Sequence, residues 1–220
     1  VAPLIRCLYL EMSSPERSVL ALVFHHAVAD GRSGNELLRR LLDCIATQNE
    51  LPTDGGMSPL PPMHQVFPPP FRWAEQPDAA KRAKEGLLTD YRRHGPLTPL
   101  SWLSSDLPTR TPRFIRLGFS SDVTQRLLAL SRQHGTSIHG AICAAQLLAQ
   151  FRLQMGNDPA TLFLSCPVDM RPLLEPAQPV APTALCTSLI SAAFVLDSST
   201  DFWALARDVI VQTRKQLARG

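Results

Sequence analysis

Residues 18–42 read SVLALVFHHAVADGRSGNELLRRLL, and this stretch changes from one kind of secondary structure to another. Residues 18–24 are apolar almost throughout, which predicts a central strand covered on both faces. From Ser33 onward, apolar residues recur three and four positions apart, which predicts a helix. Ser33 and Glu36 have the spacing of a capping box, so we expect the helix to start there. HHAVADG, at residues 25–31, therefore lies at a strand-to-helix corner.

Such a corner can hold polar side chains towards a cleft, and Gly31 gives the backbone the freedom to turn. Adjacent residues on a strand point to opposite faces, which argues against His25 and His26 sharing a metal ion. A neutral imidazole can take a proton from a hydroxyl or amine as that group attacks a carbonyl. No GxSxG, phosphate-loop or GxGxxG motif accompanies the histidines. The pattern favours a general base in a direct transfer, without a covalent enzyme intermediate.

The flanking sequence predicts an α+β, or mixed α/β, fold in two lobes. Residues 3–12 form a second β-rich run, and the polar residues before Ser18 predict an antiparallel hairpin. A proline-rich region follows, in which only residues 78–93 have a helical pattern. Beyond it we expect a strand at 114–120, a helix at 121–135 ending at Gly135, a nearly all-round apolar and buried helix at 136–156, strands at 161–170 and 184–196, and a helix at 201–220.

Composition narrows the functional class. The chain has 220 residues with 22 basic and 19 acidic side chains and no run of like charges, so we expect no nucleic-acid partner. No apolar stretch is long enough for a membrane span, and we expect a cytoplasmic protein. The cysteines are odd in number and lack a CxxC or Cys-His spacing, which predicts reduced, buried thiols and no metal: Cys7, Cys44, Cys143, Cys166 and Cys186.

His25, His26, Asp30 and Gly31 match the HHxxxDG motif of the acyltransferase superfamily that includes chloramphenicol acetyltransferase and the condensation domains of nonribosomal peptide synthetases. The chain most resembles the polyketide-associated and alcohol acyltransferase branch, through LGFS before a helix, GTSIHGAICAA, PVDMRPLL and DFWALARDV. The resemblance implies a chloramphenicol acetyltransferase-like fold. Members are usually much longer, so we expect a fragment that lacks parts of its own two-lobed fold. Its expected parts are the C-terminal part of the first lobe (1–48), a crossover linker (49–112) and the N-terminal part of the second lobe (113–220).

The resemblance also implies roles for individual residues. His26 would be the general base that deprotonates an alcohol or amine acceptor, which then attacks the thioester of an acyl-CoA or an acyl carrier protein. The thioester would be a co-substrate, with no covalently bound cofactor and with its binding residues unassigned. His25, Asp30 and Gly31 would shape the active-site loop, and Asp30 would form a structural ion pair with Arg171, because a buried carboxylate needs a cation and hydrogen bonds.

Two other classes of protein stay open at this point. One is a noncatalytic condensation-like domain for binding or docking, which would keep the motif to preserve its fold. The other is a metal-dependent hydrolase that uses His25, His26 and Asp30, which the strand geometry disfavours.

Overall fold

The computed structural model describes residues 3–13, 17–48, 63–68, 78–94, 111, 113–154, 158–174 and 184–219. The chain forms two compact units, one of Val1–Pro77 with Pro167–Ser188 and one of Asp78–Cys166 with Leu189–Gly220. The lobe boundaries expected at residues 48 and 113 stay a prediction. Within the expected linker, residues 49–62, 69–77, 95–110 and 112 lie outside the described part of the chain.

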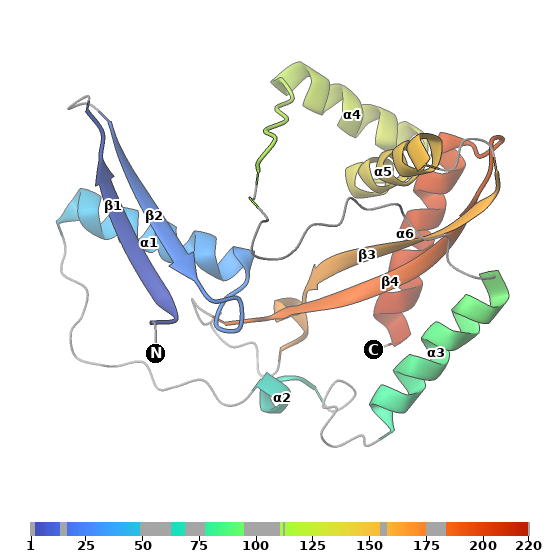
Figure 1. The fold of residues 1–220 in the computed structure, drawn as a ribbon, viewed down its shortest axis with the longest axis horizontal. Coiled ribbons are helices and arrows are strands. Elements are labelled where there is room, and N and C mark those ends of the chain that lie inside the picture. The colour runs from blue at the N-terminus through green and yellow to red at the C-terminus, as the bar shows by residue number, and fades with distance from the viewer. Residues whose placement is uncertain are drawn as a thin grey trace. The chain divides into compact units, whose positions relative to one another are not determined.

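The first unit begins with a two-stranded antiparallel sheet (Figure 1). Strand β1 (Ile5–Glu11) pairs with β2 (Ser18–Phe24), so that Ile5 lies opposite Phe24 and Glu11 lies opposite Ser18. The hairpin predicted from the two β-rich runs is therefore confirmed.

Strand β2 is less covered than its sequence predicts. It pairs with β1 alone among the described strands, and Val19 and Val23 keep 44% and 43% of their surface exposed. The prediction of a central strand covered on both faces was wrong, because an apolar run reports the character of side chains and not the number of neighbouring strands.

Helix α1 (Gly31–Thr47) follows the HHAVADG turn and packs against β2. A Cβ at Gly34 would lie 2.5 Å from the ring of Phe24, so the helix and strand approach closely at this glycine. The helix starts earlier than the capping box predicts, since Asp30 is the N-cap and accepts a hydrogen bond from the Ser33 N–H. The prediction that Ser33 starts the helix was wrong, because aspartate three residues upstream is an equally good cap.

The rest of the described first unit consists of short pieces. Helix α2 (Met63–Val66) buries Val66, and the 3₁₀ turn η4 (Arg171–Leu173) follows directly after strand β3 (Ala160–Asp169). Met170 N–H donates to the carbonyl of Cys186, just before strand β4 (Thr187–Leu196) begins.

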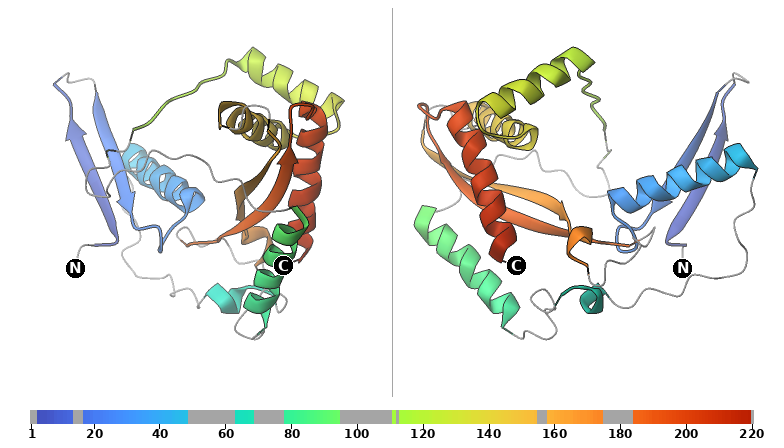
Figure 2. Two further views of the ribbon diagram at one scale, coloured as in Figure 1. Left: turned by 45° about the vertical axis from the view of Figure 1, so that its right-hand side comes forward. Right: turned by 180° about the vertical axis from the view of Figure 1, so that it is seen from behind.

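The second unit contains most of strands β3 and β4, which pair with each other, and its last two helices cover one face of them (Figure 2). The Oγ atoms of Ser165 and Ser191 lie 2.7 Å apart. With the Met170–Cys186 hydrogen bond, this pairing shows that residue numbers rise along one strand as they fall along the other, so the strands are antiparallel. The helices are α3 (Ala79–His94), α4 (Ser121–Gln133), α5 (Ile138–Gln154) and α6 (Phe202–Arg219).

The core of this unit lies between α5, α6 and the sheet. At Gly140 the helices α5 and α6 approach so closely that a Cβ would lie 2.5 Å from the Ala206 carbonyl oxygen. Thr136 Oγ1 donates to the same carbonyl over 2.8 Å, which fixes the start of α5 against α6. The buried residues of the core are Cys143, Ala144, Leu147, Leu148, Phe151, Ala160, Leu162, Cys166, Phe194, Leu196, Leu205, Ala206 and Val209.

Two expectations for the second unit were wrong. Residues 114–120 form no strand, and Phe114 and Ile115 are 98% and 88% exposed, because no described strand pairs with them. Helix α5 buries one face only, since Ile142 and Leu153 are 55% and 85% exposed. The predicted end of α4 is confirmed, because Gly135 follows the helix with a φ of +68°.

None of the helices in the described part of the chain is long and apolar enough to cross a bilayer. All five cysteines are free thiols, of which Cys143, Cys166 and Cys186 are buried as expected. Cys7 is exposed, because the hairpin strand that carries it has no described cover, and Cys44 is half-buried.

Candidate active site

The two histidines of HHAVADG lie in a turn that begins where β2 ends. His25 N–H donates to the Leu4 carbonyl over 2.8 Å, which extends the pairing with the N-terminal strand by one residue. The His25 carbonyl then accepts from the Val28 N–H over 3.0 Å, and His25 Nδ1 accepts from the Ala27 N–H over 3.1 Å. His25 is therefore bound into the turn through both its backbone and its ring.

The His26 side chain has different surroundings. The residue is exposed, and no hydrogen bond or ion pair joins its ring to another residue in the described part of the chain. The turn thus presents an imidazole whose two nitrogens have no partner among the described residues.

Asp30 lies four residues further on and is 3% exposed. Its Oδ1 accepts hydrogen bonds from the Ser33 N–H and from Arg171 Nη2, each over 2.9 Å. Its Oδ2 accepts from the Cys186 N–H over 2.9 Å and from Thr187 Oγ1 over 3.2 Å. Each carboxylate oxygen therefore has two donors, and this arrangement compensates the charge that burial would otherwise penalise.

Arg171 is the cation of this buried group, and its side chain is 4% exposed. Besides Asp30, its Nη2 donates to Ser33 Oγ over 2.6 Å and to the Ala184 carbonyl over 3.1 Å. Its Nη1 donates to Asp169 Oδ1 over 2.9 Å, and Asp169 also forms an ion pair with Arg32 on α1. The guanidinium therefore joins the start of α1 to the segment around η4 within the first unit.

The electrostatics of the pair follow from these contacts. Burial raises the pKa of the Asp30 carboxyl, but hydrogen bonds from Arg171 and from the Ser33 and Cys186 N–H groups outweigh it and hold the pKa well below its usual range. Burial lowers the pKa of Arg171, and its bonds to Asp30 and Asp169 outweigh that effect and raise it. Both groups are therefore charged at neutral pH.

Gly31 does not provide the backbone freedom that its sequence context suggests. It is the first residue of α1, its φ is not positive, and a Cβ at this position would meet nothing within 4 Å. The structure thus brings Asp30 and Arg171 together, holds His25 in the turn, and leaves His26 outside this network.

Comparison with known proteins identifies the family to which the chain belongs. Residues 108–220 match the family described as the phthiocerol/phthiodiolone dimycocerosyl transferase C-terminus, which is about half of the chain. The chain belongs to this family. A relative named phthiocerol/phthiodiolone dimycocerosyl transferase, from Mycobacterium tuberculosis strain H37Rv, is 32% identical over 209 residues, covering 91% of this chain. The Mycobacterium leprae relative of the same name is 30% identical over 213 residues. The chain spans about half the length of these curated relatives, 48% in both cases.

Solved structures show the same fold as this member of the dimycocerosyl transferase C-terminus family. Polyketide synthase associated protein 5 from Mycobacterium tuberculosis superposes with a TM-score of 0.62 at 24% identity, over 99% of this chain and 53% of that one. The first condensation domain of the calcium-dependent antibiotic synthetase superposes with a TM-score of 0.62 at 15% identity, over 98% of this chain and 46% of that one. The predicted fold class, mixed α and β of the condensation and chloramphenicol acetyltransferase type, is confirmed.

The geometry limits what each polar residue of this family member can do. Asp30 is a poor general base and a poor metal ligand, because both of its oxygens already accept hydrogen bonds from four different donors. His25, His26 and Asp30 also form no group of potential metal ligands among the described residues. The arrangement instead combines a charged scaffold with one unengaged imidazole.

Several members of the buried network were not expected from the sequence. Ser33 was interpreted as a helix cap, yet its Oγ donates to the Ala184 carbonyl over 2.8 Å and accepts from Arg171. Asp169 lies two residues before Arg171 in VDMRP, and this spacing is a signal that could have revealed a second partner. Cys186 contributes only its backbone N–H, which no side-chain pattern predicts.

A second cluster of side chains in the second unit was also missed. The ligand atoms of His139, Cys143 and Cys166 all lie within 4.8 Å of one another. His139 and Cys143 are four residues apart on a predicted helix, so two of the three residues could have been recognised from the spacing, and the interpretation that the cysteines lack a Cys-His spacing was wrong. Cys166 could not have been recognised in this way, because it lies on β3, far from the other two residues in the sequence.

Proposed function

We propose that this chain is the part of an acyltransferase that carries the general base, and that the enzyme moves an acyl group from a thioester to an alcohol or amine acceptor. Family membership and the transferase names of the curated relatives support acyl transfer. The observation that carries the choice of residue is the contrast within HHAVADG, where His26 alone has an exposed ring without a partner among the described residues.

The proposed reaction begins with His26 accepting the proton of the acceptor O–H or N–H as the heteroatom attacks the thioester carbonyl carbon. The tetrahedral adduct then collapses, the C–S bond breaks, and the thiolate takes up the proton that His26 holds. The products are an ester or amide and a free thiol, and the histidine returns to its neutral form. No covalent enzyme intermediate is needed, because the acceptor itself is the nucleophile.

Asp30 and Arg171 have a positioning role in this proposal. Their bonds fix the N-terminus of α1, and this helix start is where the HHAVADG turn ends. His25 holds the other end of the turn through its bonds to Leu4, Ala27 and Val28. The turn that carries His26 is therefore fixed on both sides, as a catalytic base requires.

The donor is proposed as an acyl-CoA or an acyl carrier protein, and the thioester is a co-substrate. The relatives' names specify dimycocerosyl transfer, and the polyketide synthase associated neighbour is consistent with a carrier-bound donor. Both donors end in the same thioester chemistry, so the role of His26 does not depend on which of them delivers the acyl group.

The test is thioester-dependent acyl transfer by the full gene product, measured as thiol release from an acyl-CoA series and from acyl carrier protein in the presence of a long-chain alcohol. His26→Ala should lower kcat by about 10²–10⁴-fold, which is the range of general-base catalysis. His26→Gln should behave in the same way, because an amide keeps the approximate shape but cannot take the proton.

Glu36→Gln provides a matched control, since Glu36 is half-buried on α1, lies outside the Asp30–Arg171 network and forms its ion pairs among the described residues with Arg39 and Arg40. It should retain the kcat of the unmodified protein. Unchanged kcat in both His26 variants would overturn the general-base role. A protein that binds an acyl carrier protein but releases no thiol with either donor would instead be a noncatalytic docking domain.

A further inference from the structure

Helix α5 and strand β3 bring three metal-ligating side chains together in the second unit, in a cluster that the proposed acyl transfer does not use. His139 and Cys143 lie one turn apart on α5, and Cys166 lies on β3. Their ligand atoms are all within 4.8 Å of one another. We call this group the α5–β3 cluster.

The distance between Cys143 and His139 is close to the spacing of two ligand atoms on tetrahedral zinc. Cys143 Sγ lies 3.7 Å from His139 Nε2 and 3.8 Å from its Nδ1. Zinc bonds of about 2.3 Å to sulfur and about 2.0 Å to nitrogen, at a tetrahedral angle, place the two ligand atoms about 3.6 Å apart. Residues at i and i+4 face the same way, so both side chains can reach one ion once the imidazole ring rotates to direct a single nitrogen at it.

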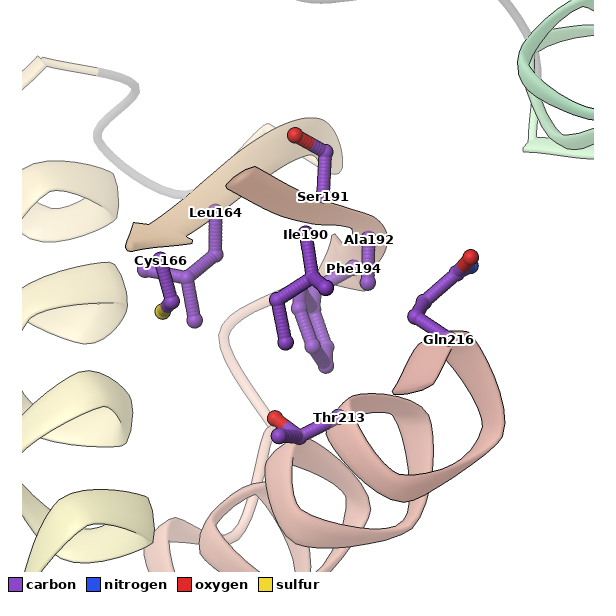
Figure 3. Close-up of a pocket in the computed structure, with 8 residues that line it drawn as sticks. All are labelled: Leu164, Cys166, Ile190, Ser191, Ala192, Phe194, Thr213 and Gln216. Atoms are coloured by element: carbon purple, nitrogen blue, oxygen red, sulfur yellow. The ribbon is translucent and has the colours of Figure 1, made fainter. Parts of the chain in front are cut away.

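Burial gives the cluster a closed side and an open side. Cys143 and Cys166 are 6% and 9% exposed and belong to the core, whereas His139 is exposed at its edge. Figure 3 shows Cys166 on the same side of the sheet as Leu164 and Phe194, and it lines a pocket with them. The open side lies at the exposed His139, so the fourth ligand there would be water.

The choice of ion follows from the donor atoms. Two thiolates and an imidazole suit zinc and other soft or borderline cations, whereas magnesium and calcium prefer oxygen ligands. Cysteine binds such an ion as a thiolate, so the ion must displace the thiol proton to bind. Binding is therefore accompanied by proton release.

We infer that His139, Cys143 and Cys166 form a binding site for one divalent cation of the zinc class, with water as the fourth ligand. The ion ties the first turns of α5 to the middle of β3 and so stabilises the core of the second unit. This site is independent of the proposed general base, which lies on a different element and in the other unit.

The test uses the reduced, metal-free 220-residue chain, with all five thiols counted before each titration. Co²⁺ serves as the optical probe, because tetrahedral thiolate coordination produces both ligand-field and sulfur-to-cobalt charge-transfer absorption. We expect one equivalent of Co²⁺ to bind, Zn²⁺ to displace it, and the unfolding temperature to rise with added Zn²⁺.

Variants separate the cluster from adventitious binding. His139→Ala should weaken Co²⁺ binding at least 100-fold, roughly the upper range for loss of an outer-shell partner, and its exposed position makes misfolding no explanation. Cys143→Ser and Cys166→Ser should each reduce the charge-transfer absorption. Cys7→Ser is the matched control, because this exposed thiol lies outside the cluster and its loss should change nothing.

The inference is overturned if the unmodified chain shows no charge-transfer absorption, or if His139→Ala binds Co²⁺ as tightly as the unmodified chain. It is also overturned if Cys7→Ser loses as much binding as the cluster variants. None of these results depends on acyl transfer, so failure of the metal site and failure of the general base are separate outcomes.

Discussion

His26 and Asp30 are four residues apart in one turn, yet their side chains have opposite surroundings. Asp30 is 3% exposed and accepts four hydrogen bonds, whereas the exposed ring of His26 has no partner among the described residues. Within one short motif, Asp30 therefore fixes the backbone, whereas the His26 side chain has no structural contact among the described residues. Mutations should separate the two residues, because Asp30 belongs to the buried network and the proposed role of His26 is catalytic.

The largest expected effect is the loss of stability in Asp30→Ala. Removing one partner of a buried ion pair leaves the other charge uncompensated, which costs about 3–5 kcal/mol in the free energy of unfolding. Urea denaturation followed by circular dichroism measures this loss. His26→Ala is the matched control and should stay within about 0.5 kcal/mol of the unmodified chain, because an exposed side chain without partners contributes little to folding.

Equal losses in the Asp30 and His26 variants would contradict the division of roles. If Asp30→Ala unfolds the first unit completely, Asp30→Asn provides a milder change, since the amide keeps the shape and loses the charge.

A smaller effect on the free energy of unfolding is expected when the pH is lowered. The pKa of Asp30 is lower in the folded chain than in the unfolded chain, so the unfolded state takes up the proton first as the pH falls. Its contribution to stability is complete above about pH 5 and is lost progressively as the pH falls through about 4 and below. The free energy of unfolding measured between pH 7 and pH 3 should fall over this window.

The free energy of unfolding of Asp30→Asn should fall less steeply between pH 7 and pH 3, because the asparagine has no proton to gain at this position. Asp169 also faces Arg171 and has a lowered pKa, so the stability of the variant should still depend on pH to some extent. An identical slope in both proteins would show that the Asp30 carboxylate adds no stability at neutral pH.

The smallest effect is expected at Glu36, which sharpens the comparison because its pKa is also lowered, to about 2. Hydrogen bonds from Arg39 and Arg40 cause this shift, but Glu36 is 34% exposed and both arginines are exposed on α1. Surface ion pairs contribute little, so Glu36→Gln should leave the urea midpoint of unfolding almost unchanged. A loss as large as that of Asp30→Ala would mean that a lowered pKa, and not burial, marks the structural carboxylate.

The sequence predicts the order of elements well and their surroundings poorly. Periodicity identified the hairpin, α1, α3, α4 and strands β3 and β4, because these patterns are local. It could not predict that residues 114–120 lack a pairing strand or that β2 is only half covered, since both depend on which segments come together.

The candidate site shows the same limit. The motif indicated His26 and Asp30, and the resemblance indicated Arg171. Ser33 and the Cys186 N–H were missed because they join the network through tertiary structure. Backbone donors have no side-chain pattern, so only a structure can reveal them.

The hydrogen bond from the Ala27 N–H into His25 Nδ1 also decides where a proton can reside. An acceptor nitrogen carries no hydrogen, so neutral His25 must be the Nε2–H tautomer and presents a donor outward. Two chemically identical rings, side by side in the chain, are thereby made different: the first has one nitrogen engaged by the backbone and can donate only from Nε2, and the second has neither nitrogen engaged among the described residues.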